Sequence, residues 1–322
     1  MAVDSTKLNL LGTNASGQPF AGYLTPEQSA PIFQEALKSS VAMRLVPQVP
    51  LGPQGKSIPI FTGAPTAEWV AEAGAKPIST GSVGMKTMSS HKIAGIFVVS
   101  AEVVRSNPGS FMENMRAKLG ESFGLAFDNA FFHGGGSGSS TSPFSQHLDQ
   151  TTKVTELGVR TPAQGGVYGD MVNVLKTLTN GGKKLKSWAL DTAIEPYLLS
   201  SLDANGRPFF VESTYGDTAP QVRSGSLLGR PVAMSDGIAG TGTGRTIGYA
   251  GDFSQAIWGV VGGITYDVTD QATLPIGTGG AMVSLWQNNL LAVRAEAEYG
   301  YLINDTAAFA KIVESDGALD DA

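Results

Sequence analysis

The fold is decided by residues 56–100, which read KSIPIFTGAPTAEWVAEAGAKPISTGSVGMKTMSSHKIAGIFVVS. This stretch predicts two extended runs, and Gly74 and Pro77 mark the tip that joins them because both residue types favour turns. A strand in a globular domain usually has about 5 or 6 residues, whereas an arm of about 15 residues spans roughly 50 Å. Since an isolated two-stranded ribbon is marginally stable in water and has unpaired edges, we expect this hairpin to pack on neighbouring copies of the chain.

Composition excludes several classes of protein. The 322 residues suffice for one large domain or two ordinary ones with a substantial core, and the formal charge of −6 argues against a basic nucleic-acid binder. With no cysteine, the chain has no disulfide, thiolate nucleophile or sulfur-ligated metal. The start MAVDSTKLNLLG lacks the basic and apolar regions of a signal peptide, and no apolar run approaches the roughly 18 residues of a membrane span.

Helical spacing is clearest over 110–132, where SFMENMRAKLGESFGLAFDNAFF predicts a helix of about 35 Å. Apolar residues recur at steps of about four along it: Phe111, Met115, Leu119, Phe123, Phe127 and Ala130. Upstream, Thr25, Pro26 and Gln28 predict the start of a shorter helix that includes Val41. The residues from Ser106 to Pro108 are expected to end the strand that returns from the hairpin.

The pattern changes after residue 166 to alternating helices and short apolar strands. VYGDMVNVLKTLTN and TAIEPYLLSSLD predict helices, whereas SWALD and LLGRPVAMSDGI predict strands, so a compact α/β subdomain is expected. Over 291–298, apolar residues alternate with Arg294, Glu296 and Glu298, which predicts a strand with one solvated face.

Three motifs that resemble parts of enzyme sites favour a structural role. Gly55, Lys56 and Ser57 match the end of a phosphate-binding loop, but Pro50 stands where the first glycine is required and no helix follows, so a turn into the hairpin is favoured. The glycines of 240–244 favour a surface loop. Ser235 lies in a sequence one glycine short of a nucleophile elbow, with no histidine after residue 147, which disfavours a serine hydrolase.

Metal and carboxylate chemistry are also disfavoured. The chain has three histidines, His91, His133 and His147, and none has a histidine or carboxylate partner at zincin spacing, so no metal or other cofactor is predicted. His133 is expected at the end of the long helix, where a cation interacts favourably with the helix dipole. Glu296 and Glu298 share a strand face with Arg294 and indicate a charge row rather than a catalytic pair.

In order and spacing, four segments of the chain resemble the major capsid proteins of tailed bacteriophages, the HK97-like fold. Residues 66–107 resemble the family's extended loop returning into its domain, and 110–138 resemble its spine helix and following loop. Residues 227–269 resemble the closing strands of the axial domain, and 288–312 the final peripheral-domain segment. The resemblance covers most of the chain and implies an α+β subunit.

The resemblance implies the following division of the chain. We expect an N-terminal arm and short helix over 1–50, an extended loop over 51–95, a peripheral domain with the spine helix over 96–165, an axial domain over 166–270, a peripheral return over 271–315 and an acidic tail over 316–322.

The implied function is structural, without catalysis. Hexamers and pentamers of such a subunit would tile an icosahedral shell around double-stranded DNA, as part of a virion assembled in the host bacterial cytoplasm. Only about twenty residues precede GYLTPEQSAP, so we expect a separate scaffolding protein, with a portal and a decoration protein as further partners. Some relatives crosslink a loop lysine to an asparagine. Lys76 and Lys86 lie in the loop, but no motif selects Asn288, Asn289 or Asn304, so non-covalent assembly is predicted.

Contacts between subunits are predicted in two regions. The loop supplies Trp69, Glu72, Lys76, Lys86, His91 and Lys92, and the late strand supplies Arg294, Glu296 and Glu298. One alternative is an encapsulin-like shell around cargo enzymes, which the polar N-terminal arm disfavours; the other is a hydrolase at Ser235.

Overall fold

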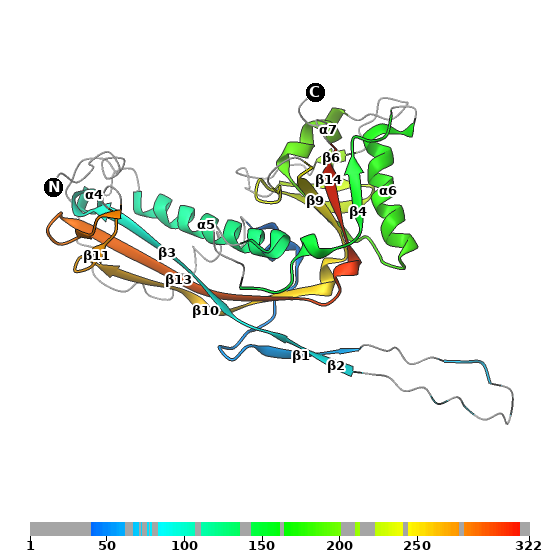
Figure 1. Cartoon of the computed structure of the whole chain (residues 1–322), viewed down its shortest axis with the longest axis horizontal. Coiled ribbons are helices and arrows are strands. Elements are labelled where there is room, and N and C mark those ends of the chain that lie inside the picture. Colours follow the sequence, from blue (N-terminus) through cyan, green and yellow to red (C-terminus); the bar gives the residue numbers. More distant parts are fainter. Residues whose placement is uncertain are drawn as a thin grey trace.

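The computed structural model describes residues 40–61, 67–70, 72, 76, 78, 83–106, 111–135, 143–161, 164–200, 210–212, 223–240, 244–276 and 280–315. The described chain has an elongated lobe, a second lobe built on a larger sheet, and a ribbon that projects away from both (Figure 1). The expected N-terminal arm up to residue 39, the hairpin tip at Gly74 and Pro77, and the acidic tail at 316–322 lie outside the described residues.

A long three-stranded antiparallel sheet forms the floor of the elongated lobe. Its order is β10 (Ala256–Thr269), β13 (Leu290–Ile303), β3 (His91–Ser100). The predicted helix is confirmed as α5 (Phe111–His133), which runs along this sheet (Figure 1). The predicted alternation in β13 is confirmed from residue 293 to 298, because Val293, Ala295 and Ala297 are buried whereas Arg294 is exposed. At 291–292 it is wrong, since Ala292 is buried.

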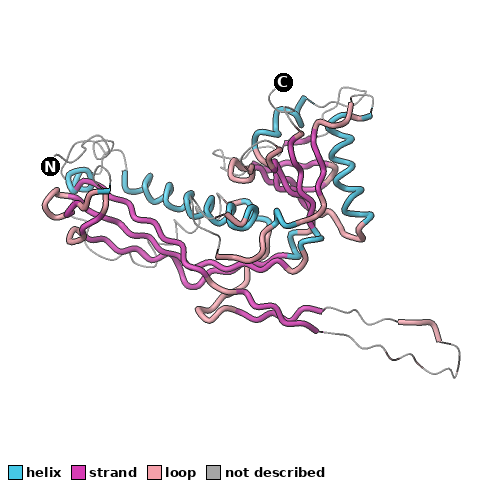
Figure 2. The backbone as a smooth tube through the Cα atoms, in the orientation of Figure 1, coloured by secondary structure: helices cyan, strands magenta, loops and turns pink. Residues whose placement is uncertain are grey.

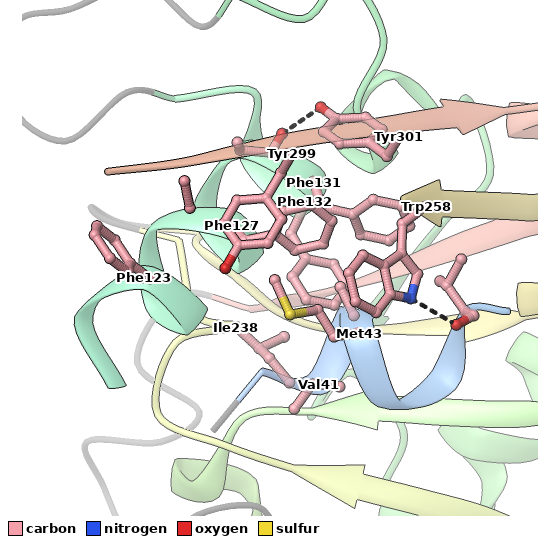
Figure 3. Close-up of a cluster of buried hydrophobic side chains, with 14 of the residues drawn as sticks. Val41, Met43, Phe123, Phe127, Phe131, Phe132, Ile238, Trp258, Tyr299 and Tyr301 are labelled. Carbon is pink, nitrogen blue, oxygen red and sulfur yellow. Dashed lines mark hydrogen bonds between the residues drawn. The ribbon is translucent and has the colours of Figure 1, made fainter. Parts of the chain in front are cut away.

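Aromatic side chains join α5 to the sheet. The ring of Phe127 packs edge-on against Trp258 at 5.8 Å, Tyr299 at 5.7 Å and Tyr301 at 5.8 Å between centroids (Figure 3). Met115, Phe123 and Ala130 of the predicted helical stripe are buried in the same core. The apolar stripe along one side of α5 therefore determines which side of the helix packs against the long sheet.

Two short helices flank this core. α3 (Val41–Leu45) is buried against α5, and α4 (Ala101–Ser106) directly follows β3. The prediction that the strand continues to Ser106 is wrong. Ser100 ends it, because the Ser100 hydroxyl accepts from the Glu102 amide at 3.2 Å, a local bond of the kind that begins a helix.

The second lobe contains a seven-stranded sheet with the order β4-β14-β9-β5-β8-β7-β6. The predicted helix over 167–180 is confirmed as α6 (Gly166–Asn180), and the strand SWALD as β5 (Ser187–Leu190). α7 (Glu195–Ser200) follows the short turn η5 (Thr192–Ile194). The other strands are β4 (Val154–Leu157), β6 (Phe210–Glu212), β7 (Arg223–Leu227), β8 (Arg230–Met234), β9 (Thr246–Gly251) and β14 (Phe309–Glu314).

The single strand predicted over 227–238 is wrong. Leu228 and Gly229 form a two-residue turn with φ of 52° and 69°, so this segment ends β7 and forms β8 of an antiparallel hairpin. Two consecutive residues at positive φ match the twist of a tight hairpin, and leucine is an unusual residue for that position. Because Leu228 is apolar, the sequence did not indicate a turn at this position.

Strand pairing also departs from the order of segments along the chain. β4 and β14 belong to the seven-stranded sheet although they lie outside 166–270, whereas β10, which lies entirely inside that range, pairs with β13 in the long sheet. Short elements complete the two lobes: η3 (Leu148–Gln150), η6 (Phe253–Gln255), β11 (Thr273–Leu274), β12 (Val283–Ser284) and η8 (Thr306–Ala308).

Candidate assembly surfaces

The projecting ribbon consists of β1 (Lys56–Phe61) and β2 (Val83–Met88), paired antiparallel (Figure 2). The second run expected over 78–100 divides here. Ser89 and Ser90 connect β2 to β3, which enters the long sheet, so only the part before residue 89 belongs to the ribbon. Met88 at the inner end of the ribbon is buried, whereas Val83 and Met85 farther out are 54% and 65% exposed.

The predicted contact residues beyond the paired strands are exposed. Trp69 is fully exposed, as is nearly all of Ile78, and Glu72 and Lys76 are also at the surface. An indole buries about 150–250 Å² when it is covered, so a free Trp69 leaves a large apolar area in water. This exposure fits a loop whose partner surface belongs to another chain.

Lys86, by contrast, is held within its own subunit. Its ammonium donates to the backbone carbonyls of Asn304 at 2.6 Å and Ile303 at 3.4 Å, at the end of β13. The side chain thus ties the ribbon to the long sheet. His91 is also engaged, since its Nε2 lies 3.0 Å from Ser89 Oγ and its ring packs edge-on against Phe144 at 4.7 Å.

A row of charges crosses the exposed face of the long sheet. Arg294 bonds Asp267 on β10 and lies 3.5 Å from Glu296, which in turn accepts from Lys92 on β3 at 3.1 Å. Hydrogen bonding to Asp267, followed by the charge of Glu296, raises the pKa of Arg294. Exposed pairs of this kind contribute about 0–1 kcal/mol, so the row sets the charge pattern of the surface more than it stabilises the fold.

Glu298 extends this row toward the residues that connect the ribbon to the rest of the subunit, 49–51 and 89–90, here called the root of the ribbon. It stands opposite Lys92 in the β13–β3 register and is half-buried. Three of the predicted contact residues therefore lie on β13, and two more, His91 and Lys92, lie on the adjacent strand β3. Of the residues predicted in the loop, the structure thus brings only Lys86, His91 and Lys92 next to β13.

Glycines allow the root of the ribbon to cross the long sheet closely. Gly259 and Gly300 stand opposite each other in the β10–β13 register. A Cβ on Gly300 would lie 2.4 Å from the Ser89 carbonyl oxygen and 2.8 Å from Leu51, and a Cβ on Gly259 would lie 2.6 Å from the Val49 carbonyl oxygen. The main chain at Val49 and at Ser89, which leads into and out of the ribbon, therefore occupies the space that a side chain at either glycine would need.

Helix α5 also binds the start of α3, at residues 40–42. The carboxylate of Asp128 is completely buried in α5 and accepts from Ser40 Oγ at 2.6 Å, the Val41 amide at 2.8 Å and the Ala42 amide at 3.0 Å. These amides are the free donors at the start of α3, so Asp128 caps that helix from a distance in sequence. Burial outweighs these bonds and raises the pKa of Asp128 to about 7.

A second polar cluster joins α5 to the larger sheet. His133 ends α5, as predicted, and its Nδ1 lies 2.8 Å from Asp149 while its Nε2 lies 2.9 Å from the Ile238 carbonyl. Bonds from His133 and Tyr249 and the charge of Lys311 outweigh burial and lower the pKa of Asp149 to about 2. Although a His–Asp pair is present, both histidine nitrogens are engaged, and Ser235 is buried beside a strand. This geometry does not form a hydrolase triad.

Other chemical motifs have structural roles. Gly55, at φ 77°, ends the turn before β1, and Lys56 begins a strand rather than a helix, so the prediction of a turn at 55–57 is confirmed.

Within the described residues, no three metal-binding side chains gather in one place, and no helix is both long and apolar enough to cross a membrane.

Sequence reasoning missed Asp128, Gly259 and Gly300. An aspartate in the apolar segment LAFDNAFF is a signal that was available, because a buried carboxylate needs donors. The glycines carry no such signal, because glycine is frequent in this chain. Glycine is needed at these two positions only because residues far away in the sequence pass close to the main chain there.

Comparison with known proteins supports one family. Residues 21–313 match the Phage capsid family. The probable major capsid protein gp17 of Mycobacterium phage D29 is 46% identical over 293 residues, covering 90% of this chain and 89% of that protein, and its counterpart from Mycobacterium phage L5 is 45% identical over 304 residues, covering 92% and 91%. A solved structure from Mycobacterium phage Ogopogo superposes with a TM-score of 0.65 at 22% identity, covering 86% of this chain and 92% of that one, which shows a shared HK97-like fold.

Proposed function

This chain belongs to the phage capsid family, and from this we propose that it is the major capsid subunit of a tailed phage, many copies of which form an icosahedral shell. The projecting ribbon is the feature on which this proposal rests. It leaves Val83, Met85 and the fully exposed Trp69 without cover from their own domain. An element of this kind buries its apolar surface only when copies assemble.

The contact surfaces follow from the same geometry. We propose that the exposed residues Trp69, Glu72 and Lys76 contact a neighbouring subunit, and that Lys92 with the β13 residues Arg294, Glu296 and Glu298 offers it a mixed-charge face. Mixed charges at such contacts set register and partner choice more than they add affinity. Lys86 and His91 act within the subunit, by fastening the root of the ribbon on which the contact depends.

The finer arrangement is also part of the proposal. The subunits form hexamers and pentamers, the shell encloses double-stranded DNA without reading its sequence, and assembly takes place in the host bacterial cytoplasm. A separate scaffolding protein, a portal and a decoration protein complete the particle. The net charge of −6 supports a container that does not hold its DNA tightly, because a strongly basic wall would bind phosphates by counterion release.

The alternatives receive no support. The relatives of known name are capsid proteins, and neither an encapsulin nor a hydrolase is indicated by them. We therefore propose a structural role without catalysis.

Loop charges provide the first test. We expect the double variant Glu72→Ala/Lys76→Ala to fold like the wild type, since both residues are exposed, but to give several-fold fewer particles by electron microscopy and sedimentation. The matched control is Lys184→Ala, an exposed lysine in the other lobe. An unchanged particle yield in the double variant would count against the loop contact, and the absence of any wild-type assembly, alone and with a scaffold, would count against the proposed function.

Covalent crosslinking provides a second test. The Lys86 ammonium bonds main-chain carbonyls, and the Asn304 side-chain amide donates to Gln255 at 3.0 Å, so neither group is poised for an isopeptide bond. We expect denaturing electrophoresis of mature particles to show this subunit only as a monomer band at its mass of 33.4 kDa. A ladder of covalent multimers would contradict non-covalent assembly.

A further inference from the structure

A compact polar cluster joins the end of α5 to the lobe of the seven-stranded sheet. His133, the last residue of α5, lies 2.8 Å from Asp149 on η3 through Nδ1, and 2.9 Å from the Ile238 carbonyl oxygen, in the loop after β8, through Nε2. The histidine side chain is only 16% exposed. Its two nitrogens therefore hold two separate segments of the chain to the end of the helix.

Both partners of the imidazole can only accept hydrogen bonds. A main-chain carbonyl has no proton, and Asp149 is ionised, because its bonds and the charge of Lys311 outweigh burial and lower its pKa to about 2. A neutral imidazole has one N–H and one lone pair, so one of its nitrogens would face an acceptor without a proton. The two contacts of His133 together fit only a ring with a proton on each nitrogen.

The surroundings of the ring favour this charged form. A cation at the end of α5 interacts favourably with the dipole of the helix. The second carboxylate oxygen of Asp149 accepts from Thr246 Oγ1 at 3.1 Å and lies 3.7 Å from Lys311 Nζ, which leaves the first oxygen for His133. The hydroxyl of Tyr249 lies 3.3 Å from His133 Nδ1.

The other histidine of the cluster, His147, has the opposite tendency. Its ring lies against the main chain of Gly134, where an added Cβ would be 2.3 Å from His147 Nδ1. Burial lowers the pKa of His147; the charge of Asp149 opposes this change, and the charges of His133 and Lys311 add to it. The titratable and charged groups around His133 are thus Asp149, His147, Tyr249 and Lys311. Of this cluster, His133 is the group suited to exchange a proton near neutral pH.

We propose that His133 makes a proton-dependent contact between α5 and the loop after β8: the doubly protonated ring binds the Ile238 carbonyl, and loss of one ring proton to solvent releases it. The proton that stays is the one on Nδ1, because a bond to a carboxylate is stronger than a bond to a neutral carbonyl. The lone pair of Nε2 then faces the carbonyl oxygen, and the loop at 238–240 moves away from the helix. This contact lies within one subunit, so it does not depend on the proposed shell function.

Hydrogen exchange and nitrogen NMR of the histidine-labelled subunit test the contact directly. The Gly240 amide donates to the Thr246 carbonyl at 2.8 Å and reports on the loop. After correction for intrinsic exchange, we expect its protection to fall about tenfold from about pH 5.5 to about pH 8.5, as His133 changes from two ring protons to one. A neutral His133 ring at the lower pH, or equal protection at both, overturns the proposal.

His133→Gln assigns the response to this residue, because glutamine does not change its charge over this range. We expect its Gly240 protection to be lower than that of the wild type at about pH 5.5 and to stay the same at about pH 8.5. His91→Gln is the control and should keep the wild-type response, since His91 contacts Ser89 and Phe144 outside this cluster. A wild-type response in His133→Gln overturns the assignment, and if that variant does not fold, the wild-type spectra still decide.

Discussion

We expect Asp128→Ala to lower the free energy of unfolding of the subunit by about 3 kcal/mol, one of the two largest effects predicted for this chain. The carboxylate is completely buried and is the acceptor for the Ser40 hydroxyl and for the first two amides of α3. Removing it leaves these donors buried without a partner, and α3 keeps only the N-cap bond in which Ser40 Oγ accepts from the Met43 amide at 3.0 Å. Chemical denaturation of the unassembled subunit measures the loss.

Asp128→Asn is the matched control. The amide has nearly the same shape and keeps one oxygen acceptor, so we expect it to lose less than half as much stability as alanine. Ser40→Ala removes one of the three bonds to Asp128 and also the bond from the Met43 amide to Ser40 Oγ, so it should cost about 2 kcal/mol. If alanine and asparagine are equally harmful, matching the shape and one oxygen acceptor is not enough, and α3 requires both carboxyl oxygens of Asp128.

The same carboxyl predicts a dependence on pH. Burial raises the pKa of Asp128 to about 7, against about 3.9 in the unfolded chain. Between these values the native state retains a proton that the unfolded state has released, so this group's contribution to stability is complete below about pH 4 and is lost as the pH rises to about 7. Asp128→Asn should lack this component of the stability profile. Parallel profiles for the two proteins would contradict a raised pKa.

Local patterns predicted much of the fold. The stripe from Met115 to Ala130 is sufficient to identify α5, since period and length agree with a helix that covers one sheet. The alternation around Arg294 identifies the solvated face of β13 in the same way. Exposure of Trp69 follows the same logic, because a hairpin too long for its own domain leaves its far residues uncovered.

Long-range pairing could not be predicted from these patterns. Asp128 and Ser40 are 88 residues apart, and nothing in either segment identifies the other. The turn at Leu228 was hidden because an apolar residue stands at a position that usually selects glycine or asparagine. Likewise, the run from β2 into β3 reads as one extended segment, and only contact with β13 divides it into a ribbon and a sheet strand.

Gly300→Ala is the second large prediction, with an expected loss of about 3 kcal/mol in the free energy of unfolding. The added Cβ would lie 2.4 Å from the main-chain carbonyl oxygen of Ser89, a separation that requires backbone movement, and 2.8 Å from Leu51. The residues that must move form the root of the ribbon. We therefore also expect the variant to assemble poorly at temperatures where its subunit is still folded.

Gly95→Ala is the control for this change, because it adds the same methyl group to another strand of the same sheet. A Cβ at Gly95 meets no atom within 4 Å, so its free energy of unfolding should stay within about 0.5 kcal/mol of the wild type. Differential scanning calorimetry and particle counts distinguish the two sites. If Gly300→Ala is as stable as Gly95→Ala, the segment at Ser89 can move away from the new methyl group at little cost. If Gly300→Ala is less stable but still assembles fully when it is folded, the angle of the ribbon does not control assembly. Loss of assembly at Gly300 alone would show that close packing of the root on the long sheet directs the ribbon toward its neighbour.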